Sequence, residues 1–223
     1  MNIISPTFIM LDAPDEAEVL SKIERIARVC YKSEGSISEG SAERLVQRLI
    51  DSGHEAMIEH CIVSVLITTD RGVTHESVRH RLASFGQEST RYCNYTNEKK
   101  FTGGITYIDL FDAMRLDPKV AKLPMQSFAA IYSEWYQACE DAERHYNKML
   151  SLGATPQIAR SVLNHSTKSE IVITMNFREW RHFFRLRTAK DAHPAMREIA
   201  IPMFRAFKEK YPVLFSDMED MNA

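Results

Sequence analysis

The sequence lacks the glycine-rich loops with which many proteins hold nucleotides. Only eight of its 223 residues are glycine, and neither G-x-G-x-x-G nor G-K-[ST] occurs. A dinucleotide in a Rossmann turn and a triphosphate in a P-loop are therefore excluded. No G-x-S-x-G elbow surrounds Ser84 or Ser89, so a serine hydrolase is poorly supported.

Cysteines and long apolar runs are scarce as well. The four cysteines lie far apart without a C-x-x-C pair, which is typical of a reducing compartment and not of a disulfide framework or zinc knuckle. The first ten residues, MNIISPTFIM, lack the basic and apolar regions of a signal peptide, and nowhere do 18 apolar residues run together. We therefore expect a cytoplasmic protein without a membrane-spanning helix.

Neither sign of charge predominates. The formal net charge is -2 and the isoelectric point is about 6.5. This balance argues against a protein that binds nucleic acid or an anionic membrane with its whole surface. Positive charge that serves a ligand must be gathered locally.

The pattern of apolar residues predicts an α+β fold in a single domain, residues 1–223. There is no internal repeat, no low-complexity tract and no proline from residue 15 to 117. We expect strands at 2–10, 61–69 and 171–175, helices at 12–30, from 41 onward, 73–81, 124–153, 176–187 and 194–210, and mostly loop at 85–104. Few strands among many helices, without regular βαβ alternation, favour the α+β class.

The longest predicted helix carries a heptad seam. Its residues alternate three and four apart: Met125, Phe128, Tyr132, Trp135, Cys139, Ala142, Tyr146 and Met149. Such a seam packs against the core of the protein or against another subunit.

The segment RHRLASFGQESTRY, residues 79–92, gathers basic and hydroxyl side chains. Its donors are Arg79, His80, Arg81, Ser84, Gln87, Ser89, Thr90 and Arg91. Because arginine donates two parallel hydrogen bonds to phosphate or carboxylate, a helix end followed by a loop could bring these donors onto one anion. The alternative is a solvated basic face, against which the apolar neighbours Leu82, Ala83 and Phe85 argue.

A second group of arginines lies among aromatic residues at 178–187. It contains Arg178, Trp180, Arg181, His182, Phe183, Phe184, Arg185 and Arg187. Arg178, His182 and Arg185 share one helical face, whereas Arg187 falls elsewhere. The group could be a stacking platform for single-stranded nucleic acid, but the overall charge favours a pocket for one nucleotide-sized ligand.

Histidines are concentrated between residues 54 and 80. His54, His60, His75 and His80 fall within 27 residues, but Ile58 stands where H-E-x-x-H needs its second histidine. His54 and His60 are six residues apart, a poor spacing for shared ligation on one helix face. We predict no metal site, and a metal-dependent hydrolase stays as a further alternative.

Four segments in the same order resemble the flavin-dependent thymidylate synthases. Residues 79–89 match the signature of that family, RHR followed by seven residues and a serine, and Arg91-Tyr92 extends the match. The matching segments are 27–33, 53–60, 79–92 and 176–187. Together they span most of the chain, roughly from residue 27 to 199.

The resemblance implies an enzyme that methylates dUMP to dTMP. In that family 5,10-methylenetetrahydrofolate supplies the carbon, and FAD reduced by NADPH supplies the reducing equivalents. The resemblance also implies a homotetramer, a bundle of long helices beside a small sheet, and active sites at subunit contacts.

The implied site residues divide between substrate and cofactor. For dUMP they are Glu76, Arg79, Gln87, Glu88, Ser89, Thr90, Arg91, Arg160 and Arg187. For FAD they are His54, Ala56, Glu59, Arg79, His80, Arg81, Asn176, Arg178 and His182. A nucleoside monophosphate needs forked donors with hydroxyl or backbone N–H groups, which residues 89–91 provide. The pyrophosphate of FAD, without a glycine loop, would fall to residues 79–81.

Arg187 is the implied catalytic residue. Uracil C5 is a weak nucleophile until negative charge develops on the ring, and the family is read as having no enzymic covalent nucleophile. Arg187 would stabilise the ring ionised at N3, an electrostatic assistance similar to that of an oxyanion hole. Ser89 is then a substrate ligand, while the protein orients the flavin that performs the redox chemistry.

The sequence departs from the family pattern at several positions. Glu76 stands where glutamine is common, Gly86-Gln87 replaces an Asn-Glu pair, and His182 stands where asparagine is frequent. The stretch 188–192 is also longer than expected. Glu76 would place a carboxylate near a phosphorylated substrate unless arginines neutralise it.

Overall fold

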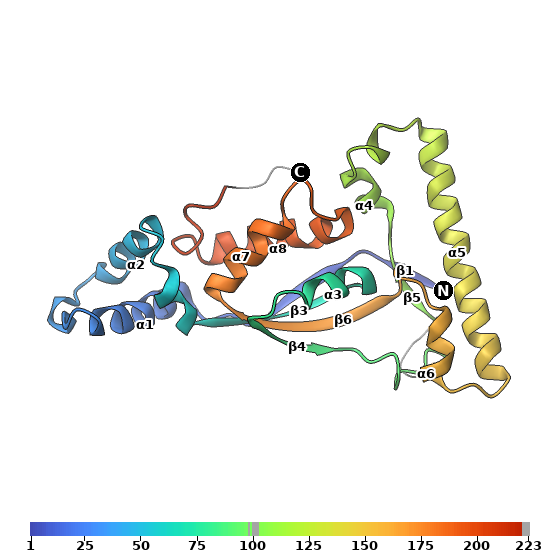
Figure 1. The fold of residues 1–223 in the computed structure, drawn as a ribbon, viewed down its shortest axis with the longest axis horizontal. Helices are drawn as coiled ribbons and strands as arrows, with labels where there is room; N and C mark the ends of the chain where they lie inside the picture. Colours follow the sequence, from blue (N-terminus) through green and yellow to red (C-terminus); the bar gives the residue numbers. More distant parts are fainter. Residues whose placement is uncertain (98, 100–102, 220–223) are drawn as a thin grey trace.

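The computed structural model describes residues 1–97, 99 and 103–219, and its central element is a four-stranded antiparallel sheet (Figure 1). In order, its strands are β2 (Thr7–Asp12), β3 (Ile62–Asp70), β6 (Lys168–Asn176) and β4 (Ala83–Gln87). A smaller sheet pairs β1 (Asn2–Ile4) in parallel with β5 (Thr106–Ile108).

Helices cover one face of the central sheet (Figure 1). They are α3 (Arg71–Ser77), α7 (Phe177–Arg187) and α8 (Pro194–Lys210). In the β-branched strands β3 and β6 every second residue is buried, because alternate side chains point to the covered face. Trp180 of α7 fixes the helix on the sheet, since its indole nitrogen donates to the carbonyl of Val63 in β3 at 3.1 Å.

The remaining helices lie at the two ends of the sheet (Figure 1). At one end are α1 (Glu16–Val29), η1 (Glu34–Ser36), α2 (Ser41–Asp51) and η2 (Glu55–His60), where η denotes a 3-10 helix. At the other end are α4 (Phe111–Leu116), η3 (Val120–Lys122), α5 (Met125–Ser151), α6 (Pro156–Ala159) and η4 (Arg160–Val162).

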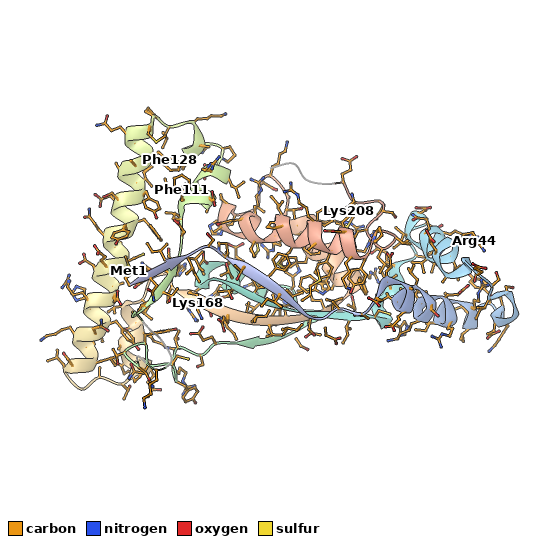
Figure 2. The ribbon with its side chains drawn as sticks, turned by 180° about the vertical axis from the view of Figure 1, so that it is seen from behind. Met1, Arg44, Phe111, Phe128, Lys168 and Lys208 are labelled. Carbon is orange, nitrogen blue, oxygen red and sulfur yellow. The ribbon has the colours of Figure 1, made fainter. Side chains whose placement is uncertain are left out.

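The heptad seam of α5 faces the chain along much of the helix. Cys139 and Tyr146 of the seam are fully buried in a second hydrophobic core that also contains Tyr107. Figure 2 shows Phe111 and Phe128 close together where α4 meets α5, with their ring centroids 5.5 Å apart. The C-terminal half of the seam therefore belongs to the core of the chain itself, whereas Met125 at its start is 80% exposed.

The α+β class with small sheets is confirmed, with local differences from the prediction. The strand expected at 2–10 is two strands in different sheets, because Pro6 between them has no N–H to donate. Residues 85–87, expected as loop, form the end of β4, an edge strand whose alternation is obscured by Gly86. Residues 98 and 100–102 of that expected loop lie outside the described residues. The helix expected at 73–81 ends at Ser77.

No helix in the described ranges is long and apolar enough to cross a lipid bilayer. The assignment of residues 1–223 to one domain stays a prediction.

Candidate active site

Two pockets hold several of the expected ligand-binding residues. The first, which we call the Arg178 pocket, is lined by His54, Ala56 and Arg178, among others. The second, the Arg160 pocket, is lined by Thr90 and Arg160, among others. The first set was expected to bind FAD and the second to bind dUMP.

The two pockets lie at opposite ends of the central sheet. In the β3–β6 ladder, Ile62 pairs with Asn176 at the end of the Arg178 pocket, and Asp70 pairs with Lys168 at the end of the Arg160 pocket. Eight residue steps of about 3.4 Å place the two ends roughly 27 Å apart. A single chain therefore keeps its two groups of expected ligands well separated.

The segment 79–92 runs along the sheet between these ends. Its strand β4 pairs Ala83 with Met175 and Gln87 with Ile171. Residues 79–81 consequently lie beside α7, whereas residues 89–91 lie beside the Arg160 pocket.

Hydroxyl and guanidinium groups meet at the Arg160 pocket. Thr90 is 4% exposed, and its Oγ1 accepts a hydrogen bond from Nη1 of Arg160 at 3.0 Å. Oγ of Ser89 accepts from the backbone N–H of Arg91 at 3.4 Å. The side chain of Arg91 is exposed and lies over the ring of Tyr92 at 5.4 Å.

Two other expected dUMP ligands are bonded within the chain. Nε2 of Gln87 donates to Oγ1 of Thr74 at 2.8 Å. The carboxylate of Glu88 pairs with Lys168 at 2.9 Å and accepts from the hydroxyl of Tyr95 at 3.1 Å. Burial raises the pKa of Tyr95, and the charge of Glu88 raises it further. These bonds hold the end of β4 against the neighbouring residues of the chain.

The Arg178 pocket is open and partly polar. His54 and Ala56 are exposed, and Arg178 pairs with Glu59. The side chain of Asn176 caps α7 by accepting from a backbone N–H in its first turn at 2.9 Å. Arg79 and Arg81 are exposed as well, and no carboxylate of the described chain pairs with either.

His80 connects the segment 79–92 to α7. It is 4% exposed, its Nδ1 lies 3.0 Å from Oε1 of Glu179, and its Nε2 accepts from Nε of Arg187 at 3.1 Å. Because arginine is only a donor, Nε2 carries no proton, so Nδ1 carries it and donates to Glu179. Burial lowers the pKa of His80, and the charge of Arg187 lowers it further. His80 is thus held neutral in one tautomer.

Glu76 completes the surroundings of Arg187. Nη1 of Arg187 donates to the Glu76 carboxylate at 3.2 Å, and Nη2 donates to the Glu76 carbonyl oxygen at 3.0 Å. The second carboxylate oxygen of Glu76 lies 2.9 Å from Nδ1 of His193. The carboxylate of Glu76, which stands where the family commonly has glutamine, is therefore paired with two basic groups of the same chain.

The remaining arginines of α7 are neutralised by carboxylates. Arg181 is fully buried, pairs with Glu55 at 2.9 Å and with Asp217 at 2.8 Å, and so has a structural role. Arg185 reaches Glu55 at 3.1 Å, and Arg178 lies 3.8 Å from it.

The aromatic residues of α7 are inaccessible. Trp180, Phe183 and Phe184 are at most 1% exposed. Bases cannot stack on buried rings, so a platform for single-stranded nucleic acid is excluded on this helix.

One cluster of the described residues has the size of a metal site, but its donors do not fit one. Ligand atoms of His80, Glu179 and His182 lie within 4.8 Å of one another. Since Arg187 donates to Nε2 of His80, the proton must stay on Nδ1, where a metal ion would have to displace it. His54, His60 and His75 lie outside this cluster of described residues.

The sequence reasoning missed three residues of these networks. Glu179 and His193 hold the partners of Arg187, and Arg71 lines the Arg160 pocket. Only the position of Arg71, two residues after the end of the predicted buried strand, gave a signal that could have been used.

These features define a class of protein: an α+β protein whose pockets are lined by arginines and hydroxyl-bearing side chains in place of a glycine-rich loop. The model of the family described as "Thymidylate synthase complementing protein" matches residues 14–213. The chain belongs to this family.

Individual relatives agree with the family. The flavin-dependent thymidylate synthase of Corynebacterium diphtheriae is 32% identical over 214 residues, which cover 93% of this chain and 81% of that protein. The enzyme of the same description from Corynebacterium aurimucosum is 30% identical, with 92% and 82% covered. Among solved structures, the UMP/dUMP methylase PolB from Streptomyces cacaoi bound with 5-Br dUMP aligns with a TM-score of 0.81 and 25% identity, over 97% of this chain and 96% of that chain. The predicted enzyme class, an FAD-dependent thymidylate synthase that forms dTMP from dUMP, is confirmed.

Proposed function

We propose that dUMP binds with its phosphate in the Arg160 pocket. The observation that carries this placement is the hydrogen bond from Arg160 to the buried hydroxyl of Thr90. Ser89 and Arg91 lie beside it and add a hydroxyl and a guanidinium. Forked donors combined with hydroxyls suit a phosphate monoester.

FAD is assigned to the opposite end of the sheet. His54, Ala56 and Arg178 line the pocket there. Arg79 and Arg81 are exposed and lack a carboxylate partner in the described chain, so their charge is available to a pyrophosphate. When bound and reduced by NADPH, FAD supplies the reducing equivalents that turn the transferred carbon into a methyl group.

Arg187 is assigned the stabilisation of the pyrimidine ring. Its guanidinium is held by His80 and by the carboxylate and carbonyl of Glu76, so the donor is positioned before substrate arrives. A preorganised positive charge favours the ring ionised at N3 without further reorganisation, and this raises the nucleophilicity of C5.

The transfer of carbon from 5,10-methylenetetrahydrofolate is assigned no enzymic covalent nucleophile. Burial raises the pKa values of the thiols of Cys61 and Cys139, which keeps both protonated and unreactive. Cys30 lines the Arg178 pocket, at the far end from the dUMP phosphate. Ser89 accepts a hydrogen bond from a backbone N–H and has no base beside its hydroxyl in the described chain.

A complete active site is assigned to two neighbouring chains of a homotetramer. The roughly 27 Å between the pockets of one chain argues that the flavin of one chain faces the dUMP of another. An uncovered face of the sheet supports assembly, because Ile9, Leu11 and Ile62 are 58%, 53% and 51% exposed there. A cytoplasmic location stays a prediction.

The direct test is reconstitution of the reaction. The protein with FAD, dUMP, 5,10-methylenetetrahydrofolate and NADPH is expected to form dTMP, and omission of FAD or NADPH should stop it. The visible spectrum should show bound flavin and should change when dUMP is added. A preparation that is colourless as purified and binds none of the added FAD would contradict the assignment.

A further inference from the structure

Arg71 is a basic residue that neither the RHR signature nor the family resemblance singles out. It is the first residue of α3, directly after β3, and it lines the Arg160 pocket. We propose that Arg71 is a second guanidinium that binds the phosphate of dUMP together with Arg160. The inference rests on the proposed placement of that phosphate in the Arg160 pocket.

The guanidinium of Arg71 has a buried donor without an acceptor. Its Nη1 atom is shielded from solvent, and no acceptor in the described part of the chain reaches it. Arginine keeps its proton, so a shielded N–H that loses water without gaining a partner is unfavourable. Native proteins leave few such groups, and a ligand that supplies the acceptor accounts for one at the wall of a pocket.

The backbone fixes Arg71 without using its side chain. The N–H of Arg71 donates to the carbonyl of His165 at 2.9 Å, which ties the start of α3 to the segment before β6. The neighbouring carboxylate of Asp70 caps α3 by accepting from the N–H of Val73 at 2.6 Å. The acidic group nearest in sequence is thus committed to the helix, and the Arg71 guanidinium stays available.

The Arg160 pocket has the composition of a phosphate site. Its lining residues are Arg71, Thr90, Gln157, Arg160, Ser161 and Leu163. No carboxylate belongs to this set, and Glu88, which precedes the neighbouring Ser89, is neutralised by Lys168. A phosphate monoester carries nearly two negative charges near neutral pH and accepts several hydrogen bonds. Two guanidinium forks and two hydroxyls match that group.

The test separates binding of the phosphate from binding of the rest of the nucleotide. Isothermal titration of the FAD-loaded enzyme measures the dissociation constants of dUMP and of deoxyuridine, which lacks the phosphate. Arg71→Ala is expected to weaken dUMP binding by about ten- to a hundredfold and to leave deoxyuridine binding unchanged. Arg71→Lys should fall between, because lysine keeps the charge but loses the fork. Inorganic phosphate should compete with dUMP less well in both variants.

Two reference variants make the outcomes distinguishable. Arg25→Ala is the matched control, since Arg25 is exposed on α1 and hydrogen-bonds Ser21, and it should change neither constant. Arg160→Ala reports whether the phosphate lies in this pocket at all. The ligand-free melting temperature of Arg71→Ala should not fall, because the substitution removes an unsatisfied donor.

Three results would overturn the inference. If Arg160→Ala lost the preference for dUMP over deoxyuridine but Arg71→Ala kept it, Arg71 would be excluded and the proposed dUMP site would stay intact. If both variants kept the preference for dUMP over deoxyuridine, the phosphate would bind elsewhere, and both the role of Arg71 and the proposed dUMP site would be rejected. Equal weakening of dUMP and deoxyuridine in Arg71→Ala, with a lowered melting temperature, would show a structural role instead.

Discussion

Nε of Arg187 donates a hydrogen bond to Nε2 of His80 at 3.1 Å. This contact joins the C-terminal end of α7 to the central residue of the RHR signature, and Glu179 holds the opposite ring nitrogen of His80 at 3.0 Å. The three residues form one line of hydrogen bonds that fixes the direction of the Arg187 guanidinium. The tautomer of His80 therefore decides whether this residue can accept the hydrogen bond that holds Arg187.

Removal of the Arg187 guanidinium tests its assignment to the chemical step. Arg187→Ala is expected to lower kcat by about a hundred- to a thousandfold, the usual effect of removing one preorganised donor. FAD should stay bound, because the Arg178 pocket lies at the other end of α7. Steady-state kinetics and flavin absorbance check both points. Undiminished turnover would contradict the role.

Glu179 is expected to act as a positioning residue through His80. Glu179→Ala leaves the Nδ1 proton of His80 without its acceptor, so kcat should fall by about tenfold, the equivalent of one hydrogen bond. Glu179→Gln keeps an oxygen that can accept from Nδ1 and should restore most of kcat. Steady-state kinetics of both variants measure these effects. Equal losses of kcat in the two would show that the tautomer of His80 does not affect turnover.

Acid should weaken the folded protein through His80. Burial holds the pKa of His80 below its ordinary value of 6.5. Its contribution to stability is therefore complete above pH 6.5 and is lost as the pH falls from there through the lower pKa of the folded state. Melting temperatures of the wild type should drop over that interval, while His80→Gln should show a shallower drop. Parallel curves for the two proteins would argue against this account.

Two arginines of α7 form a matched pair for stability. Arg181 is fully buried between Glu55 and Asp217, whereas the side chain of Arg185 is 45% exposed beside the same two carboxylates. Arg181→Ala leaves a cavity in place of a fully buried side chain and removes its hydrogen bonds to Glu55, Asp217 and the Leu214 carbonyl, so it is expected to cost about 3–5 kcal/mol of unfolding free energy. Arg185→Ala should cost less than about 1 kcal/mol. Urea denaturation measures both, and similar costs would refute the distinction.

Local sequence patterns were sufficient for much of the fold. The β-branched alternation in β3 and β6 and the helical spacing in α7 reflect interactions within each element, so both could be predicted. The edge strand β4 could not, because Gly86 and Ser84 leave only a weak apolar alternation and its partner β6 lies about 90 residues away.

The residues of the candidate site also divide into those that the sequence predicts and those that only the fold reveals. Arg160 and Arg187 were reached through resemblance to a family, which carries positions but not their partners. The contact of His80 with Glu179 spans 99 residues, and nothing in the spacing of either predicts it. Arg71 lies outside every motif, and only the fold shows that its guanidinium meets the Arg160 pocket.

The most direct test of a site shared between chains is complementation. Arg160→Ala and Arg178→Ala each damage one pocket, and each protein alone should be nearly inactive. Hybrid oligomers made by co-expression of differently tagged chains should contain sites with both arginines intact, so dTMP formation should rise well above that of either parent. Hybrids no more active than the two parents would show that each chain carries a complete active site and would contradict the account.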